Sequence, residues 1–131
     1  MKISGKFDVT LEPMDTYATG AEGANLGRMS INKNFHGELS AQSQGEMLSV
    51  MTAVKGSAGY VAIEQVVGTL SGMTGSFVLQ HYGMMSGGKD TLILEVVPDS
   101  GTGELLGLSG NMTIKVDGGQ HIYEFEYTKP Q

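Results

Sequence analysis

Glu64 and His81 are the two residues of this chain whose types and spacing suggest chemistry. They lie in a stretch from Tyr60 to His81, YVAIEQVVGTLSGMTGSFVLQH, in which two alternating, β-branched runs are joined by Gly-Met-Thr-Gly. This pattern is typical of a β-hairpin. Apolar surroundings raise the pKa of a carboxyl group, and a neighbouring imidazole can share its proton. If the two side chains meet, they can form a general acid/base pair.

The turn of this hairpin predicts how its two strands pair. We place the tip at residues 73–74, which makes Glu64 and His81 diagonal neighbours on one face of the hairpin. The rest of that face is apolar, so both side chains are predicted to be buried. A structural interpretation is preferred, because buried polar groups commonly satisfy one another inside a core. The predicted pairs are Leu70 with Phe77, Gly68 with Leu79, Val66 with His81, and Glu64 with Gly83.

Glu46 is a third candidate for the same pocket. It lies in a long predicted strand from Glu38 to Val54, and the turn at residues 55–59 brings it near Gly68 on the next strand. The apolar residues of the long strand change parity at Gly45, which predicts a β-bulge there. The bulge leaves the direction of the Glu46 side chain open. A solvent-facing carboxylate is preferred, whereas an inward one would add a polar group to a binding site.

The elements that position these residues are all strands. Period-two alternation of apolar residues recurs along the 131-residue chain, which has 20 glycines for tight turns and no long segment of helical periodicity. We therefore predict an all-β, single-domain fold over residues 1–131. The predicted architecture is an antiparallel meander of eight strands closed into a barrel, because closure removes exposed strand edges. A two-sheet sandwich is the alternative architecture, and one short helical turn is expected at residues 104–108. The predicted core includes Phe7, Ile31, Leu79, Leu94, Ile114 and Phe125.

Charge and composition exclude several classes of function. The net charge is -6, and the 8 basic residues are scattered along the chain, which argues against partners such as nucleic acid or an anionic membrane. The chain has no cysteine, and His36, His81 and His121 are dispersed, so no metal site and no cofactor are expected. It also has no apolar run long enough to cross a membrane and no leader-like apolar segment, so a cytoplasmic location is expected.

The face of the hairpin opposite Glu64 is also apolar, although one face of an antiparallel sheet is usually polar. An apolar patch that faces outward needs to be covered. We therefore predict a homo-oligomer, most simply a two-fold dimer. The residues predicted to form the patch are Ile63, Val67, Val78 and Met84.

Four segments carry a resemblance to a known family. They are GSAGYVAIE, GSFVLQH, SGTGELLGLSG and a closing DGG-H-Y-F-Y pattern. With these segments the chain resembles a bacterial domain-of-unknown-function family, number 3224, over nearly its whole length. That family is similar in fold to the allene oxide cyclase barrel, so the resemblance implies a closed eight-stranded barrel and a tendency to form oligomers. No catalytic residue can be carried over, because no sequence motif is shared with allene oxide cyclase.

Three functions remain open from the sequence. The first is a small barrel that binds a small apolar or amphipathic ligand, with Glu64, His81 and Glu46 as candidate polar contacts. The second is an isomerase or cyclase that acts inside the barrel, for which fold analogy is the only support. The third is a non-catalytic structural or interaction protein with a solid interior. The discriminating observation is whether the interior beside Glu64 and His81 is accessible to a ligand.

Overall fold

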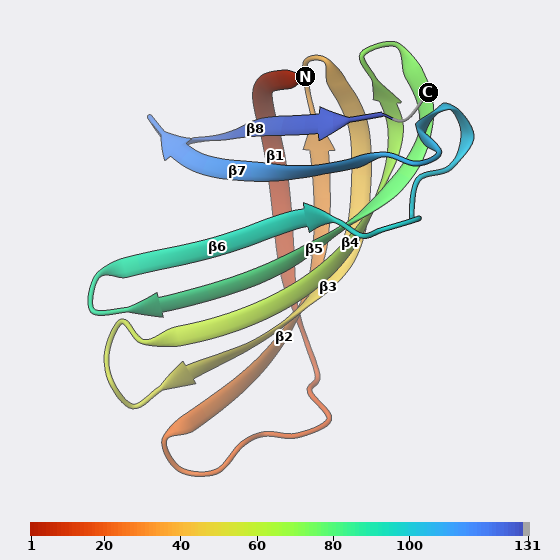
Figure 1. The fold of residues 1–131 in the computed structure, drawn as a ribbon. Coiled ribbons are helices and arrows are strands. Elements are labelled where there is room, and N and C mark those ends of the chain that lie inside the picture. The colour runs from red at the N-terminus through yellow and green to blue at the C-terminus, as the bar shows by residue number, and fades with distance from the viewer. Residues whose placement is uncertain (130–131) are drawn as a thin grey trace.

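Eight antiparallel strands surround a single hydrophobic interior in the computed structural model, which describes residues 1–129 (Figure 1). Each strand pairs with the next along the chain, and the last pairs with the first. The predicted closed meander barrel is therefore confirmed, and the two-sheet sandwich is wrong. The strands are β1 (Lys2–Met14), β2 (Ala24–Phe35), β3 (Leu39–Thr52), β4 (Ala58–Leu70), β5 (Met73–Ser86), β6 (Lys89–Val96), β7 (Ser109–Asp117) and β8 (Gln120–Thr128).

The core lies at the end of the barrel closed by a short 3-10 helix, η1 (Gly103–Leu105). Leu105 and Leu108 are buried and belong to the same hydrophobic cluster as the barrel side chains. The helical turn expected at residues 104–108 is thus present in this segment and covers one end of the sheet. Five of the six predicted core residues are buried, while Ile114 is half-buried and packs against the cluster.

The β4–β5 turn differs from the predicted one. Leu70 pairs with Met73, so the turn consists of Ser71 and Gly72, with φ angles of 48° and 82°. Two successive positive φ values are typical of the type I′ turn, whose twist matches that of the flanking strands. The predicted tip at residues 73–74 was wrong. Each residue of β4 has a partner four positions away from the predicted one, and because four is even, every side chain keeps its predicted face.

The predicted bulge at Gly45 is also wrong. The β3 ladder runs without interruption, with Gly45 opposite Ile31 on β2 and opposite Glu64 on β4. The change in apolar parity has another cause. Beyond Gly45, the apolar side chains of Leu48 and Val50 lie on the outer face, so the hydrophobic pattern changes face while the backbone stays regular.

The barrel is closed over only part of its length. β8 pairs with β1 from Lys2 to Phe7, and the rest of β1 continues past it, while β6 and β7 share only the pair Glu95–Asn111 (Figure 1). Beyond the β7–β8 hairpin, the inner side of the remaining sheet is therefore not covered by opposing strands. We call this surface the open inner face. By strand alternation its side chains are those of Val9, Leu11, Met29, Met47, Tyr60 and Met85, all half-buried or exposed.

Candidate functional site

Four polar side chains from four neighbouring strands meet inside the barrel. The Glu64 Oε2 atom accepts a hydrogen bond from Lys33 Nζ at 2.9 Å and lies 2.5 Å from His81 Nε2. Its other oxygen, Oε1, accepts a hydrogen bond from the Ser43 hydroxyl at 2.9 Å. Lys33, Ser43, Glu64 and His81 are called the inner charge cluster below. The Glu64 carboxylate is at its centre, with Lys33 and His81 at one oxygen and Ser43 at the other.

Strand alternation and one glycine place this cluster. Lys33 lies between Ile31 and Phe35 on the inward side of β2, where an apolar residue would be expected. Gly45 is opposite Glu64 on β3, and a Cβ atom there would collide with the Ile63 carbonyl and the Glu64 backbone. Because Gly45 has no side chain, β3 can approach the backbone of β4 closely at Glu64.

Burial and charge act in opposite directions on Glu64. The relative exposure of the Glu64 side chain is 0%, and those of Lys33 and His81 are 5% and 6%. Burial alone raises the pKa of Glu64, but the hydrogen bond from His81 and the positive charge of Lys33 outweigh it and lower the pKa to about 2. Glu64 is therefore an ionised carboxylate. Lys33 is held further by the Phe7 ring, whose centroid is 4.9 Å from Nζ.

Tyr60 connects the inner charge cluster with the open inner face. Its ring centroid is 6.3 Å from that of His81, and it lies over Gly83, where a Cβ atom would collide with the ring. Tyr60 is half-buried. Burial and the negative charge of Glu64 raise the pKa of Tyr60, so the phenol stays protonated and its hydroxyl remains a hydrogen-bond donor.

The structure brings together two of the three candidate residues. Glu64 and His81 are diagonal neighbours as predicted, although the partner of Glu64 is Leu79 and not Gly83. The predicted partner of Glu64 lies two residues after His81, and the observed partner lies two residues before it. Glu64 and His81 are diagonal neighbours in both registers, so the error in the turn does not affect their contact. The cross-strand partner of His81 is Ala62, not Val66.

Glu46 lies away from the cluster, on the outer side of the barrel. It forms an ion pair with Arg28, with distances of 2.5 and 2.7 Å from its Oε1 atom to two guanidinium nitrogens. Its side chain is 54% exposed. The preferred solvent-facing interpretation of Glu46 therefore agrees with the structure, and the pocket role does not. Because β3 has no bulge, odd-numbered residues face inward along the whole strand and Glu46 cannot.

Lys33, Ser43 and Tyr60 were not found by the sequence reasoning. A signal was present for Lys33, since it shares the parity of Ile31 and Phe35 and must face inward with them. An inward lysine in a strand predicts a buried anionic partner, because an unpaired buried charge is too costly. Ser43 and Tyr60 carried no comparable signal, because both residue types are common on either face of a strand.

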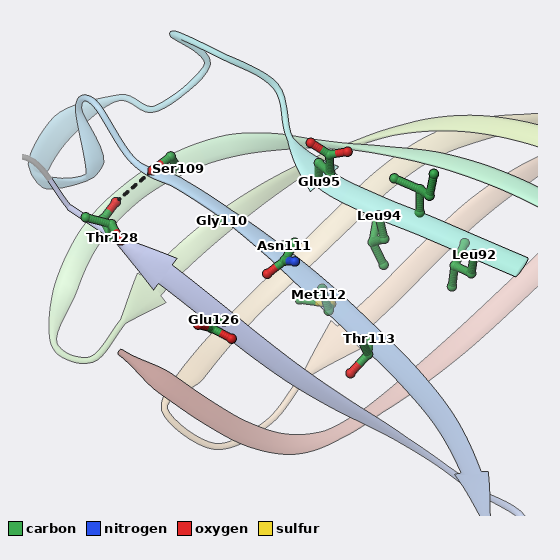
Figure 2. Close-up of a pocket in the computed structure, with 11 residues that line it drawn as sticks. Leu92, Leu94, Glu95, Ser109, Gly110, Asn111, Met112, Thr113, Glu126 and Thr128 are labelled. Carbon is green, nitrogen blue, oxygen red and sulfur yellow. Dashed lines mark hydrogen bonds between the residues drawn. The ribbon is translucent and has the colours of Figure 1, made fainter.

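A second feature, a crevice of about 600 Å³, lies along the seam between β6 and β7 (Figure 2). Buried Leu94 and Met112 form its floor, while Glu95, Asn111 and Glu126 stand along its outer side. Leu94 is the cross-strand partner of His81, so the crevice lies beside the inner charge cluster. It does not reach Glu64, whose exposure is 0%.

Within residues 1–129, the structure shows neither a metal-binding group of side chains nor a helix that could span a membrane. No group of three or more His, Cys, Asp or Glu side chains in this range is placed to hold a metal ion. His36, for example, faces outward and pairs with Asp8 at 2.8 Å. No helix in the described part of the chain is long and apolar enough to cross a membrane.

Comparison with known proteins agrees with the fold. The sequence model of a family described as "Protein of unknown function (DUF3224)" matches residues 3–127. The chain belongs to the DUF3224 family. A crystal structure of a DUF3224 protein of unknown function from Shewanella oneidensis MR-1 has a TM-score of 0.97 and 63% sequence identity. That match covers 100% of this chain and 98% of the other. No curated protein matches the chain significantly, so DUF3224 membership confirms the resemblance and brings no activity with it.

Proposed function

We propose that the chain binds a small amphipathic molecule on the open inner face, with the molecule's polar group against His81 and Tyr60. The observation that carries this proposal is an ionised cluster inside the barrel, next to inward-facing apolar side chains that stay exposed. Leu11 and Met85 are 46% and 40% exposed although alternation points them inward. Buried charge and exposed apolar surface are both energetically costly, and ligand binding would explain why the protein has both.

Stability alone does not account for the inner charge cluster. Removing two charges from water costs several kcal/mol per ion, and well-packed apolar residues in place of a buried ion pair are often neutral or stabilising. By this principle, an apolar pair in place of Lys33 and Glu64 is expected to cost the fold little. Their retention in an otherwise apolar interior supports a role toward a ligand.

The surrounding side chains indicate the chemistry of the ligand. Met29, Met47 and Met85 offer flexible thioethers that adapt to irregular apolar shapes. Tyr60, beside the cluster, is half-buried and is therefore the more accessible polar side chain, whereas His81 within the cluster is buried. The Nε2–H group of His81 already donates to Glu64, so the Tyr60 hydroxyl is the donor offered to a ligand, whose polar group is an acceptor such as a carboxylate or a carbonyl. An eight-stranded barrel has room for one small ligand at most.

The same geometry favours binding over an isomerase or cyclase reaction. Glu64 has its pKa lowered to about 2 and is fully buried, so it is a weak base that a substrate cannot touch. All fully buried side-chain nitrogen and oxygen atoms in the described residues have a hydrogen-bond partner, so the buried groups of the cluster already satisfy one another. The cluster is therefore suited to orient His81, and less suited to transfer a proton.

A fluorescence titration with anilinonaphthalene sulfonate, competed by decanoate, tests the proposal. Met47 and Leu48 are neighbours on β3 that face the inner and outer sides, so Met47→Asp and Leu48→Asp are a matched pair. We expect Met47→Asp to weaken probe binding about tenfold or more, because it puts a charge on the apolar contact surface. Leu48→Asp should leave binding unchanged. Probe binding that is lost in Leu48→Asp and kept in Met47→Asp, or no competition by decanoate, would overturn the proposal.

A further inference from the structure

A continuous apolar surface crosses four strands on the outer side of the barrel. Its central row is Leu48, Val61, Tyr82 and Ile93, which are successive cross-strand partners on β3, β4, β5 and β6. Each is about half exposed, between 47% and 54%. Together with three further exposed side chains this row forms the outer apolar face, which consists of Leu48, Val61, Ile63, Val67, Tyr82, Met84 and Ile93.

The outer apolar face is large enough for a specific interface. Four strands about 4.8 Å apart, with outward residues about 6.8 Å apart along each strand, give a patch of about 500 Å² between Met84 and Val67. Two such patches bury about 1,000 Å² when they meet, which is the lower limit for a biological interface. Gln65 and Gln80 also lie within this area, so its apolar part is smaller and is centred on the row Leu48, Val61, Tyr82 and Ile93. The largest apolar patch on a protein surface is often an interaction site.

The relief of this face also suits a close contact. A hollow of about 580 Å³ lies between Arg28, Glu46, Leu48, Val61, Ile63 and Gln80, and a second of about 290 Å³ lies toward Met84. Leu48 and Val61 line both hollows. Tyr82 is 47% exposed on the strand next to Val61, and half-exposed tyrosines are typical anchors of protein interfaces.

The charges on this face indicate what kind of partner it meets. Arg28 and Glu46 at the β2–β3 border neutralise each other in an ion pair. Glu95, at the opposite border beside the seam crevice, is exposed and can stay hydrated at a rim. A charged partner would therefore find little to complement on the face. The same face on another copy would bring apolar atoms together without opposing like charges at the centre.

We propose that two copies of this chain form a two-fold dimer by packing their outer apolar faces against each other. Such an interface is isologous, so each copy contributes the row Leu48, Val61, Tyr82 and Ile93. The open inner face lies on the other side of the same strands and stays free in the dimer. Dimer formation is thus independent of ligand binding. Leu48, one of the two outward apolar residues behind the change of parity in β3, lies in this interface.

Sedimentation equilibrium of the full chain at micromolar concentration, with two variants, tests the dimer. Val61→Glu puts a charge in the central row, and Leu106→Glu puts one on a loop residue that is 71% exposed and lies outside the face. We expect twice the monomer mass for the parent and for Leu106→Glu, and a dissociation constant raised about tenfold or more for Val61→Glu. A monomeric parent, an assembly larger than a dimer, or a dimer that survives Val61→Glu would overturn the proposal.

Methionine oxidation tests the same interface without any substitution, in case Val61→Glu does not fold. Met84 lies on the outer apolar face and is 50% exposed, while Met51 on the inner side of β3 is 63% exposed. With hydrogen peroxide, we expect Met84 to oxidise more slowly than Met51 at concentrations where the dimer forms, and to lose this protection on dilution. Equal oxidation of both residues at every concentration would overturn the proposal.

Discussion

At the scale of single residues, the chain is organised around one carboxylate. Glu64 is fully buried, yet it stays ionised because Lys33 and His81 lie at its Oε2 atom and Ser43 lies at its Oε1 atom. The electrostatic attraction within the cluster is strong, but its net contribution to stability is small because desolvation offsets most of it. Removing a single partner is therefore far more costly than removing all of them.

Lys33→Met tests this asymmetry. The substitution keeps the length of the side chain but removes the cation, so Glu64 loses the partner at 2.9 Å and keeps a buried negative charge. We expect the free energy of unfolding in urea to fall by about 3–5 kcal/mol. Lys6→Met, at an exposed position of β1, is the control and should change it by less than about 0.5 kcal/mol. A loss below about 1 kcal/mol for Lys33→Met would contradict the ionised cluster.

Acid should destabilise the protein through Glu64. Its pKa is lowered from 4.5 to about 2 in the folded state, so unfolding takes up a proton between these values. The stabilisation from this carboxylate is complete above pH 4.5 and is lost as the pH falls toward 2. It amounts to roughly 3 kcal/mol, at about 1.4 kcal/mol per pKa unit. Urea unfolding across this range should show a shallower acid loss in Glu64→Gln, and equal slopes for the two proteins would contradict the shift.

At the scale of the elements, the β3–β4–β5 sheet positions the cluster through regular ladders and a glycine. The β3–β4 ladder continues through Gly45, whose missing side chain leaves room for the backbone of Glu64. The β4–β5 ladder is set by the two-residue turn at Ser71 and Gly72. Regular pairing on both sides of β4 fixes which residues of β3 and β5 lie beside Glu64.

Gly45→Ala should therefore be damaging although the substitution adds only a methyl group. The new Cβ would meet the Ile63 carbonyl and the Glu64 backbone, which can move only by separating two strands. We expect a loss of about 1–3 kcal/mol in thermal or urea unfolding. Gly59→Ala is a matched control on β4, since its nearest neighbours would be at 3.7 Å, and it should be neutral or stabilising. Equal effects of the two variants would show that Gly45 is not a packing constraint.

At the scale of the whole molecule, closure of the barrel is uneven. Only Glu95 and Asn111 pair across the β6–β7 seam, whereas β3, β4 and β5 pair along nearly their whole lengths. The uneven closure leaves the open inner face uncovered on one side of the sheet. The outer apolar face lies on the opposite side of the same long strands. One sheet thus presents two distinct surfaces, one proposed for a ligand and one for a second copy.

Hydrogen exchange should report this uneven closure. Backbone amides of β6 and β7 that point into the seam lack a ladder partner except at the single pair. We expect about half of the amides in these two strands to exchange rapidly, while those of β4 exchange slowly in native conditions. Peptide-resolved mass spectrometry measures the difference. Uniform protection of β4, β6 and β7 would mean that the seam is closed in solution.

The sequence by itself determined which residues form strands and which side of the sheet each one shares with its neighbours. Alternation fixes these faces, and an even change of register leaves them intact, so Glu64 and His81 met despite a wrong turn. Tertiary structure decided the rest. Lys33 reaches Glu64 across 31 residues of chain, and Glu46 turns outward because β3 is regular. Local patterns carry no information about which strands curl together or where a barrel stays open, because those depend on the packing of all eight strands at once.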